Sequence, residues 1–340
     1  MKYILILIAL SYSMTVSSQQ IYKYNDSHKI GTGKTLHLSS NDANVIISGN
    51  NTSNASIEIY REAKGSIAKK EDFGFEIEEK NGDLFILERR KQSKVNFIGY
   101  LNIMEYTINI SLPHNVKLKL EGDDDNYEIK NIDGEIIIKS EDGNVNIFEC
   151  NSPKINIKSD DGNINIANFN GDFKTSLEDG NITMTDCVIN NFDVKIDDGN
   201  INLKYCETRD TKIRTEDGNI NLDVVKGDLS VTLDDGDFVA HDVYSQNIDI
   251  KGYDGDVSLG LHMENNANYK IELDDGDLDI ELLSGGGIIK VRCDDGDVKL
   301  RSRDFDMLTD EDHYKEIKTS GSGNGKMVVK IEDGNVRIGK

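Results

Sequence analysis

The stretches "INIKSDDGNINI" (155–166), "VKIDDGNINL" (194–203) and "KIRTEDGNINL" (212–222) are copies of one motif. Each copy carries an acidic residue, an Asp, a Gly and an Asn, with alternating apolar residues on both sides. The motif glycines follow one another at steps of 18 to 21 residues, except for a last step of 38. They are Gly143, Gly162, Gly180, Gly199, Gly218, Gly236, Gly255, Gly276, Gly296 and Gly334. A fixed period of this length predicts a solenoid, in which each repeat is one coil that buries its core only against neighbouring coils.

The residues around each Gly predict the cross-section of a coil. Apolar residues stand five positions before the Gly and two and four positions after it, as Ile213, Ile220 and Leu222 do around Gly218. A period of two predicts a strand with one face inward on each side of the Gly. Asp-Gly tolerates positive φ at both corner positions of a tight turn, so it predicts the corner between these strands. The sequence therefore predicts an all-β fold, a right-handed parallel β-solenoid (β-helix) with coils of ~19 residues.

The two ends of the chain are less regular, and they set the predicted domain boundaries. Residues 19–120 are predicted to form a β-rich N-terminal region, either as early irregular coils or as a small β-sandwich domain. Residues 121–340 are predicted to form the solenoid with its acidic Asp-Gly turns. Within it, an excursion or short helix at 301–325 precedes a final coil. Three imperfect copies of the motif have Ala43, Gly82 and Asp125 at the corner.

A third side is expected to close each coil. Seven positions after the Gly, a mostly apolar row predicts inward-facing residues: Cys150, Phe169, Cys187, Cys206, Val225, Val243, His262 and Leu283. Cys293 occupies another inward position. We interpret the four cysteines as small buried hydrophobic residues. Only Cys187 and Cys206 lie in adjacent coils, so a disulfide between these two is the alternative interpretation.

The N-terminus predicts export. Met1-Lys2 precedes the apolar run "YILILIALSYSM", which is too short to span a bilayer, and small residues follow. We predict a signal peptide at residues 1–18, cleaved after Ser18. The mature protein is then expected in the periplasm or at the extracellular cell surface, with no transmembrane segment.

The formal net charge is -23 at pH 7, and the motif supplies most of it. Asp precedes the Gly in all ten copies, and the residue before that Asp is acidic in nine of them, with Tyr253 as the exception. A chain of this charge repels phosphates, which excludes nucleic acid as a partner. Divalent cations are better partners, because stacked carboxylates and turn carbonyls offer the oxygen ligands that Ca²⁺ prefers.

The Asp before each Gly therefore forms a candidate Ca²⁺ ladder. Its members are Asp142, Asp161, Asp179, Asp198, Asp217, Asp235, Asp254, Asp275, Asp295 and Asp333. The alternative is that Asp and Asn only form good turns on a solvated edge. The six histidines are scattered without metal-ligand spacing. No other cofactor is predicted.

Three stretches resemble the bacterial putative-adhesin family, a group of exported β-solenoid domains of unknown function. The first is "YTINISLPHNVKLKLEGDDDNYEIKNIDGEIIIKSEDGNVNI" (106–147), the second is the Gly-polar-Ile pattern of the middle coils, and the third is "TSGSGNGKMVVKIEDGNVRIG" (319–339). The resemblance implies a right-handed β-solenoid at a cell surface or in the periplasm. This chain differs from the family in its acidic pair before nearly every Gly.

These observations favour a non-enzymatic, secreted, adhesin-like binding or scaffold protein that presents a rigid acidic rod, stabilised by Ca²⁺ if the ladder binds it. Its ligand would be a surface, a glycan or a protein. The alternative is a purely structural component of the cell envelope or of its stress response. A polysaccharide-acting β-helix enzyme is less favoured, because the acids are spread evenly along one edge and would repel uronates.

Overall fold

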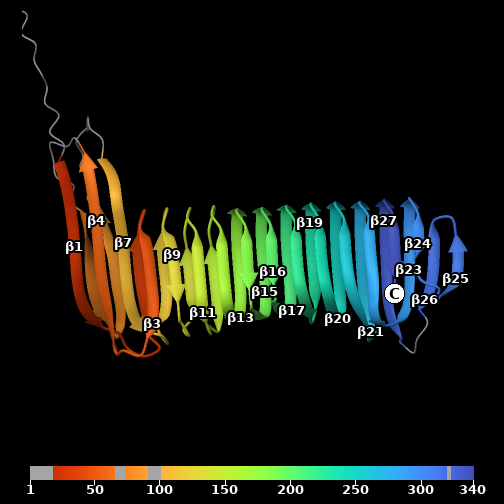
Figure 1. Cartoon of the computed structure of the whole chain (residues 1–340), viewed down its shortest axis with the longest axis horizontal. Coiled ribbons are helices and arrows are strands. Elements are labelled where there is room, and N and C mark those ends of the chain that lie inside the picture. Colours follow the sequence, from red (N-terminus) through yellow and green to blue (C-terminus); the bar gives the residue numbers. More distant parts are fainter. Residues whose placement is uncertain (1–17, 66–72, 91–100, 320–322) are drawn as a thin grey trace, which may run out of the picture.

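The chain forms a long rod of stacked β-coils in the computed structural model (Figure 1). The structure describes residues 18–65, 73–90, 101–319 and 323–340. The fold is 77% strand, with no helix among these residues, which confirms the predicted all-β class. Apart from Ser18, the predicted signal peptide lies outside the described residues.

The strands fall into an N-terminal group, a middle group and a C-terminal group along the rod. The N-terminal group is β1 (Ser18–Lys29), β2 (Thr35–Ser40), β3 (Asn44–Asn50), β4 (Asn54–Gly65), β5 (Phe73–Lys80), β6 (Asp83–Arg90) and β7 (Leu101–Pro113). The middle group is β8 (Lys117–Gly122), β9 (Asn126–Lys130), β10 (Ile136–Lys139), β11 (Val145–Cys150), β12 (Lys154–Lys158), β13 (Ile164–Asp179), β14 (Ile182–Thr185), β15 (Val188–Asp198), β16 (Ile201–Lys204), β17 (Glu207–Asp217), β18 (Ile220–Lys226), β19 (Leu229–Asp235), β20 (Phe238–Asp254), β21 (Val257–Asp275) and β22 (Leu278–Gly285). The C-terminal group is β23 (Gly287–Asp295), β24 (Val298–Leu300), β25 (Phe305–Glu311), β26 (Tyr314–Thr319), β27 (Gly325–Asp333) and β28 (Val336–Gly339).

Strands of the middle group pair in parallel with the equivalent strands of the neighbouring coils. On one side of the rod β13 pairs with β15 and β15 with β17, so that Val194 lies between Thr175 and Ile213. On the next side β14 pairs with β16, and Ile182 lies beside Ile201. Paired residues are one sequence repeat apart, which confirms the β-solenoid repeat. Antiparallel pairs occur only at the two ends among the described strands, so the sheet is mixed rather than wholly parallel.

The core runs the length of the rod because every coil adds the same inward positions. Ile164, Ile182, Ile201 and Ile220 stack in one such row, each no more than 1% exposed. The period of two places these side chains inside and their polar neighbours outside. Each buried aliphatic side chain stabilises the fold by roughly 1.5–3 kcal/mol relative to exposure, and no coil can bury its row alone.

A second corner of the coil uses the left-handed backbone region without Gly. Four residues stacked in successive coils have φ of 53 to 54°: Glu149, Asn168, Asp186 and Tyr205. Asn and Asp tolerate this region better than most residues, whereas a Tyr there is unusual. Each is followed by a residue of the predicted third-side row, and that row is buried from Cys150 to Val243.

The predicted inward row is wrong for His262 and Leu283. His262 faces outward and stacks on Tyr244 with ring centroids 3.9 Å apart, and Leu283 is 41% exposed. Leu261 pairs with Val243 and takes the inward place, because the pairing register shifts between β20 and β21 and again between β21 and β22. Such shifts are β-bulges, which accommodate extra residues in a coil that is longer than its neighbours.

At the N-terminal end, the first coil in the sequence is not the first coil in space. Strands β2 and β3 form a coil that pairs on one side with β8 and β9, where Leu36 lies beside Leu118. On its other side the same coil pairs in parallel with β6 and β7, which come later in the chain. Strand pairing is continuous across residue 120.

The three imperfect motif copies have different outcomes. Ala43 and Asp125 stack on the motif corners, since Asn126 N donates to Ala43 O at 2.9 Å and Gly143 lies against the Asp125 carbonyl. Gly82 does not, because it lies in the tight turn of the antiparallel β5–β6 hairpin, with φ of 86°. The prediction for Gly82 was wrong because a hairpin turn and a coil corner share the same Asn-Gly chemistry.

At the C-terminal end, the last coil in the sequence is inserted between two earlier coils. Strand β27 pairs with β21 on one side and β23 on the other, and β28 likewise lies between β22 and β24. The predicted final coil is therefore the last coil in the sequence but does not lie at the end of the rod. The excursion before it is a β-hairpin, β25–β26, whose strand β26 pairs antiparallel with β23 at the end of the rod (Figure 1).

Candidate functional site: the acidic edge

The motif glycines lie over one another in a single column. A Cβ atom on any of them would overlap the carbonyl oxygen of the corner in the neighbouring coil, as Gly199 would overlap Gly180. Their φ angles run from 113 to 146°, a region that residues with a side chain rarely adopt. The Asp before each Gly keeps negative φ, so the expectation of positive φ at both corner positions is wrong.

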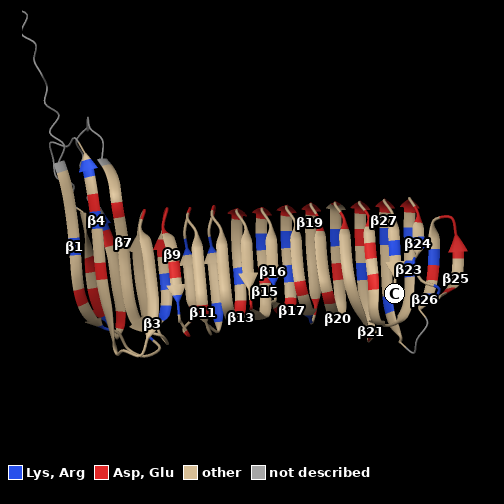
Figure 2. Ribbon diagram, viewed as in Figure 1, with Lys and Arg blue, Asp and Glu red and all other residues tan. Residues whose placement is uncertain are grey.

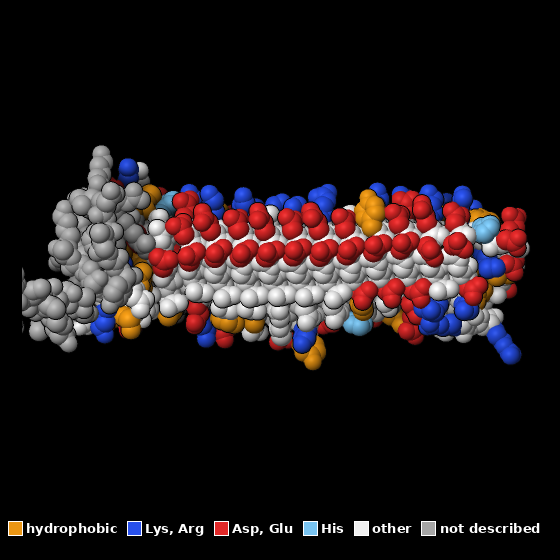
Figure 3. All heavy atoms as spheres, turned by 90° about the horizontal axis from the view of Figure 1, so that it is seen from above, with side chains coloured by type: hydrophobic (Ala, Val, Ile, Leu, Met, Phe, Trp, Pro, Cys, Tyr) orange, Lys and Arg blue, Asp and Glu red, His pale blue; other side chains and the backbone are white. Residues whose placement is uncertain are grey.

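The Asp residues of the predicted Ca²⁺ ladder also form a column, beside the glycines. Direct pairing joins Asp161 to Asp179, and the same register continues from Asp179 to Asp275. Asp333 then lies between Asp275 and Asp295, because its coil is inserted there. Figure 2 shows the acids gathered where the strands meet at this turn edge, and Figure 3 shows two acidic rows along the rod. We call this surface the acidic edge.

Two carboxylates of this column have raised pKa values. Desolvation by the surrounding chain, followed by the charges of Asp142 and Asp179, raises the pKa of Asp161 above its ordinary value. Desolvation and the charges of Asp179 and Asp217 do the same for the pKa of Asp198. Both shifts mean that the folded chain resists carrying charge at these positions. Among the residues that the structure describes, no group of three or more His, Cys, Asp or Glu side chains is arranged to hold a metal ion.

The residue after each Gly forms a hydrogen-bonded ladder that the sequence analysis missed. The side-chain oxygen of Asn181 accepts from the backbone N of Asn200 at 3.0 Å and from its amide Nδ2 at 3.0 Å. The backbone bond repeats in ten steps from Asn126 to Asp297. The recurrence of Asn or Asp at this position was the available signal, because both supply an acceptor oxygen on a short side chain.

The ladder loses its side-chain hydrogen-bond donors where Asp replaces Asn. Asp237, Asp256 and Asp277 still accept the backbone N–H of the next coil, but a carboxylate cannot donate back. Asp277 is stabilised as an anion by hydrogen bonds from Asn335 and an ion pair with Arg337 at 2.8 Å, which together lower its pKa.

A basic column accompanies the acidic edge, and the sequence analysis also missed it. Four positions before the motif Gly, in-register pairs stack these residues: Lys139, Lys158, Ser176, Lys195, Arg214, Thr232, Lys251, Glu272, Lys330 and Arg292. Within single strands, Lys195 forms an ion pair with Asp197 at 2.7 Å, and Arg292 with Asp294 at 2.9 Å. Such exposed pairs contribute little to stability individually. They place positive charge beside the outer acidic row, which is the row of residues two positions before each motif Gly (Figure 3).

Asp125 stands in the column of motif glycines and, unlike the aspartates of the acidic edge, is fully buried. Its carboxylate accepts hydrogen bonds from Ser40 Oγ at 2.7 Å, the Ala43 backbone N at 2.6 Å and Tyr127 Oη at 3.2 Å. Burial raises its pKa to about 6, against the lowering effect of these donors. Asp125 therefore links the β2–β3 coil, which carries Ser40 and Ala43, to the β8–β9 coil.

The four cysteines are buried thiols, as we interpreted them. Cys187 donates to Thr185 O at 3.2 Å and Cys206 to Lys204 O at 3.2 Å, so each thiol satisfies a carbonyl of its own coil.

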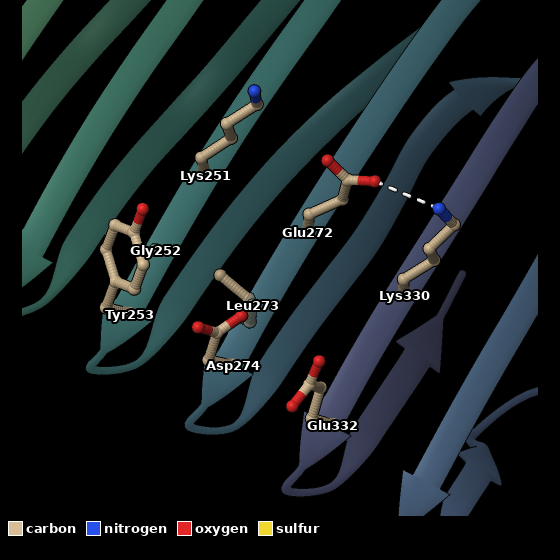
Figure 4. Close-up of a pocket in the computed structure, with 8 residues that line it drawn as sticks. All are labelled: Lys251, Gly252, Tyr253, Glu272, Leu273, Asp274, Lys330 and Glu332. Atoms are coloured by element: carbon tan, nitrogen blue, oxygen red, sulfur yellow. Dashed lines mark hydrogen bonds and ion pairs between the residues drawn. The ribbon is translucent and has the colours of Figure 1, made fainter.

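The outer acidic row and the basic column are both interrupted at one place, beside a hollow. This hollow has a volume of about 350 Å³ and is lined by Lys251, Gly252, Tyr253, Glu272, Leu273, Asp274, Lys330 and Glu332 (Figure 4). Tyr253 is 54% exposed, and Lys330 Nζ lies 3.1 Å from Glu272 Oε1. The residues come from β20, β21 and β27, so the hollow exists only because the last coil is inserted beside β21.

The fold and edge correspond to a known family. Residues 34–339 match the model of the Toastrack family, DUF4097. The chain belongs to this family. The match covers both the N-terminal coils and the inserted C-terminal coil, and it confirms the resemblance seen in the sequence. No curated protein matches the chain.

Two solved structures are similar to this Toastrack chain at low identity. One is a "putative cell adhesion protein" from Clostridium sporogenes, 12% identical, with a TM-score of 0.26, covering 95% of this chain and 99% of that chain. Another is a "putative adhesin" from Parabacteroides merdae, 11% identical, with a TM-score of 0.24, covering 78% and 93%. Within the described part of the chain, no helix has the length and apolar character to span a membrane.

Proposed function

We propose that this Toastrack protein is a non-enzymatic, exported, adhesin-like scaffold that binds a ligand at the cell surface. The observation that carries the proposal is the register of the coils, which repeats the same outward rows of acids, amides and bases along the rod. A rod in which each backbone segment pairs with both neighbours presents these rows at fixed spacing. The proposal includes a right-handed winding, because parallel crossovers almost always have that hand.

The even distribution of the acids supports binding rather than catalysis. A polysaccharide-cleaving β-helix needs acids and bases gathered around one bond, with pKa values moved apart to serve as acid and base. Here the pKa values of Asp161 and Asp198 are both raised, first by desolvation and then by like charges of adjacent coils, so these two pKa values are not moved apart.

A binding assay tests the proposal. The full chain is produced by secretion, labelled, and incubated with intact bacteria and with isolated cell envelopes. Saturable binding that heat-unfolded protein does not show is the expected result. Absence of saturable binding to either would overturn the proposal and favour the purely structural role, which a deletion strain with increased sensitivity to envelope stress would support.

Export is part of the same proposal and has its own measurement. N-terminal sequencing of the secreted protein is expected to begin at Gln19, since the predicted signal peptide ends at Ser18. Protein retained in the cytosol with Met1 still present would contradict it.

We further propose that Ca²⁺ stabilises the acidic edge. The support is the in-register aspartate column, where carboxylates repeat at the strand spacing and repel one another. Ca²⁺ takes six to eight oxygen ligands, which carboxylates of adjacent coils can share with water.

A further inference from the structure

The coils beside the hollow at Tyr253 carry residues that differ from those of the other motif copies. Gly252 is the only Gly three positions before a motif Gly, and Tyr253 is the only non-acidic residue two positions before one. In the next coil Glu272 is the only acid of the basic column. Tyr253 interrupts the acidic row, and Glu272 reverses the charge of the basic column in the next coil, so two changes on the outer face mark this place as different from the rest of the edge.

Tyr253 and Glu272 face a common space. Lys251, Glu272 and Lys330 lie side by side in register on three adjacent strands, and Glu272 pairs with Lys330. Asp274 and Glu332 continue the outer acidic row beyond Tyr253 (Figure 4). Gly252 itself faces inward, because a Cβ there would meet the Leu273 and Leu233 side chains of the core. The result is an open aromatic ring with ammonium and carboxylate groups around it.

The stability of the rod does not require this arrangement. An Asn or Ser in place of Tyr253 would relieve the repulsion between neighbouring acids equally well, with far less apolar area exposed to water. An exposed aromatic ring with charged hydrogen-bonding groups around it is instead characteristic of a binding site, where the ring supplies contact area and the polar groups fix orientation.

The ligand chemistry follows from these groups. One face of a pyranose ring is made of C–H groups that pack on an aromatic ring, while its hydroxyl groups both donate and accept hydrogen bonds. Carboxylates such as Glu272 and Asp274 accept from hydroxyls, and the Lys251 ammonium donates to them. A volume of about 350 Å³ lies at the small end of ligand pockets and holds one or two sugar rings. The acidic edge disfavours uronic acids and other anionic sugars.

We propose that the hollow lined by Lys251, Tyr253, Glu272 and Lys330 binds a neutral sugar unit of a surface glycan. This inference rests on the proposed adhesin-like function and names the ligand class for it. Tyr253 is the platform for the sugar ring, and the three charged residues orient its hydroxyl groups. The rest of the glycan extends over the outer face of β20, β21 and β27.

The test uses the full secreted chain and defined neutral oligosaccharides. Oligomers of glucose, mannose, galactose and N-acetylglucosamine are titrated by saturation-transfer difference NMR, which detects weak binding and identifies the protons nearest the protein. Binding of at least one series is expected, with the largest transfer to the ring C–H protons on one face. No transfer from any of the four series would overturn the proposal.

The matched variants locate the site. Tyr253→Asp restores the residue type of the other motif copies, so it is expected to fold as the wild-type chain does and to weaken binding at least tenfold. Tyr253→Phe keeps the ring and is expected to bind within about threefold of wild type. Tyr205→Ala removes an 80% exposed Tyr at the other corner and is expected to leave binding unchanged. Equal binding by Tyr253→Asp and wild type would overturn the assignment.

The same variant separates this inference from the proposed function. If Tyr253→Asp still binds cells or envelopes saturably while sugar binding was never detected, the adhesin-like proposal stands and the sugar site is wrong. If that cell binding is removed by protease treatment of the cells but not by glycosidases, the partner is a protein, which also overturns the sugar site.

Discussion

At the scale of single residues, the motif glycine meets two independent requirements. Its φ lies where residues with a side chain are strained, and its Cα hydrogen is the only group that fits against the next coil's carbonyl. The sequence analysis predicted the first requirement but not the second, because close approach between coils depends on how the coils stack.

Two substitutions separate these requirements. Gly199→Ala is expected to lower the free energy of unfolding by ~3 kcal/mol or more, since the added Cβ overlaps the Gly180 carbonyl. Gly33→Ala is the control for positive φ without a close contact, because Gly33 has φ of 69° and nothing lies within 4 Å of its Cβ position. It is expected to cost ~1 kcal/mol. Urea denaturation measures both, and equal losses would show that backbone strain alone decides the corner.

Asp125 predicts how stability depends on pH. Its pKa is about 6 in the folded chain, against an ordinary Asp pKa of 3.8, so the folded state binds the proton more tightly. Protonated Asp125 therefore adds to the free energy of unfolding at low pH, and this contribution is lost as pH rises through about 6. Stability is expected to fall by ~1.5 kcal/mol between pH 5 and 7.5 from this residue alone.

The Asp125→Asn variant isolates this effect. Urea denaturation at the two pH values is expected to show a smaller decrease for the variant than for wild type, whatever its absolute stability. Asp161 and Asp198 have raised pKa values as well and stay in the variant, so part of the decrease remains. An unchanged pH dependence would mean that Asp125 does not hold the raised pKa.

At the scale of elements, the coils at both ends of the rod follow one another in a different order in space than in the sequence. The β2–β3 coil lies inside the strands β6 and β7, and the β27–β28 coil lies inside β23 and β24. The outermost strands belong to antiparallel hairpins and pairs. Exposed sheet edges promote aggregation, so ending the stack with antiparallel elements protects it.

Cross-linking tests the inserted C-terminal coil. The pair Asp279→Cys and Arg337→Cys places thiols on directly paired strands, within disulfide reach. The pair Asp279→Cys and Lys299→Cys is the control, because Arg337 lies between these positions and separates them by about two strand spacings, ~9.6 Å. Mass spectrometry under non-reducing conditions is expected to find a disulfide in the first variant only. The reverse result would mean that the coils stack in chain order.

At the scale of the whole molecule, the charge is organised in rows rather than spread over the surface. Two acidic rows, an amide ladder and a basic column run parallel along one edge (Figure 3). Neighbouring carboxylates at ~4.8 Å repel by ~0.9 kcal/mol even in bulk water, and salt screens much of this. The rod should therefore respond to cations along its full length.

Calcium titration tests this response. With ionic strength held constant, the melting temperature is expected to be several degrees higher in 5 mM Ca²⁺ than in chelator, because Ca²⁺ reduces the repulsion within the aspartate column. Mg²⁺ at the same concentration serves as the control, since it gives up its water less readily. Equal melting temperatures in Ca²⁺ and chelator would leave the aspartates as turn residues without a metal.

Local alternation and a period that each coil repeats were enough to predict the repeat, the all-β class, most of the inward rows and the column of corners. The sequence by itself could not reveal which coils are neighbours at the ends, since Asp275 pairs with Asp333, about three repeat steps away, and not with Asp295 of the next coil in the sequence. It also could not show that His262 faces outward, because one register shift moves a side chain to the opposite face. Only the tertiary structure placed Lys330 beside Glu272 and so formed the hollow at Tyr253, because that contact depends on an inserted coil and not on any local pattern.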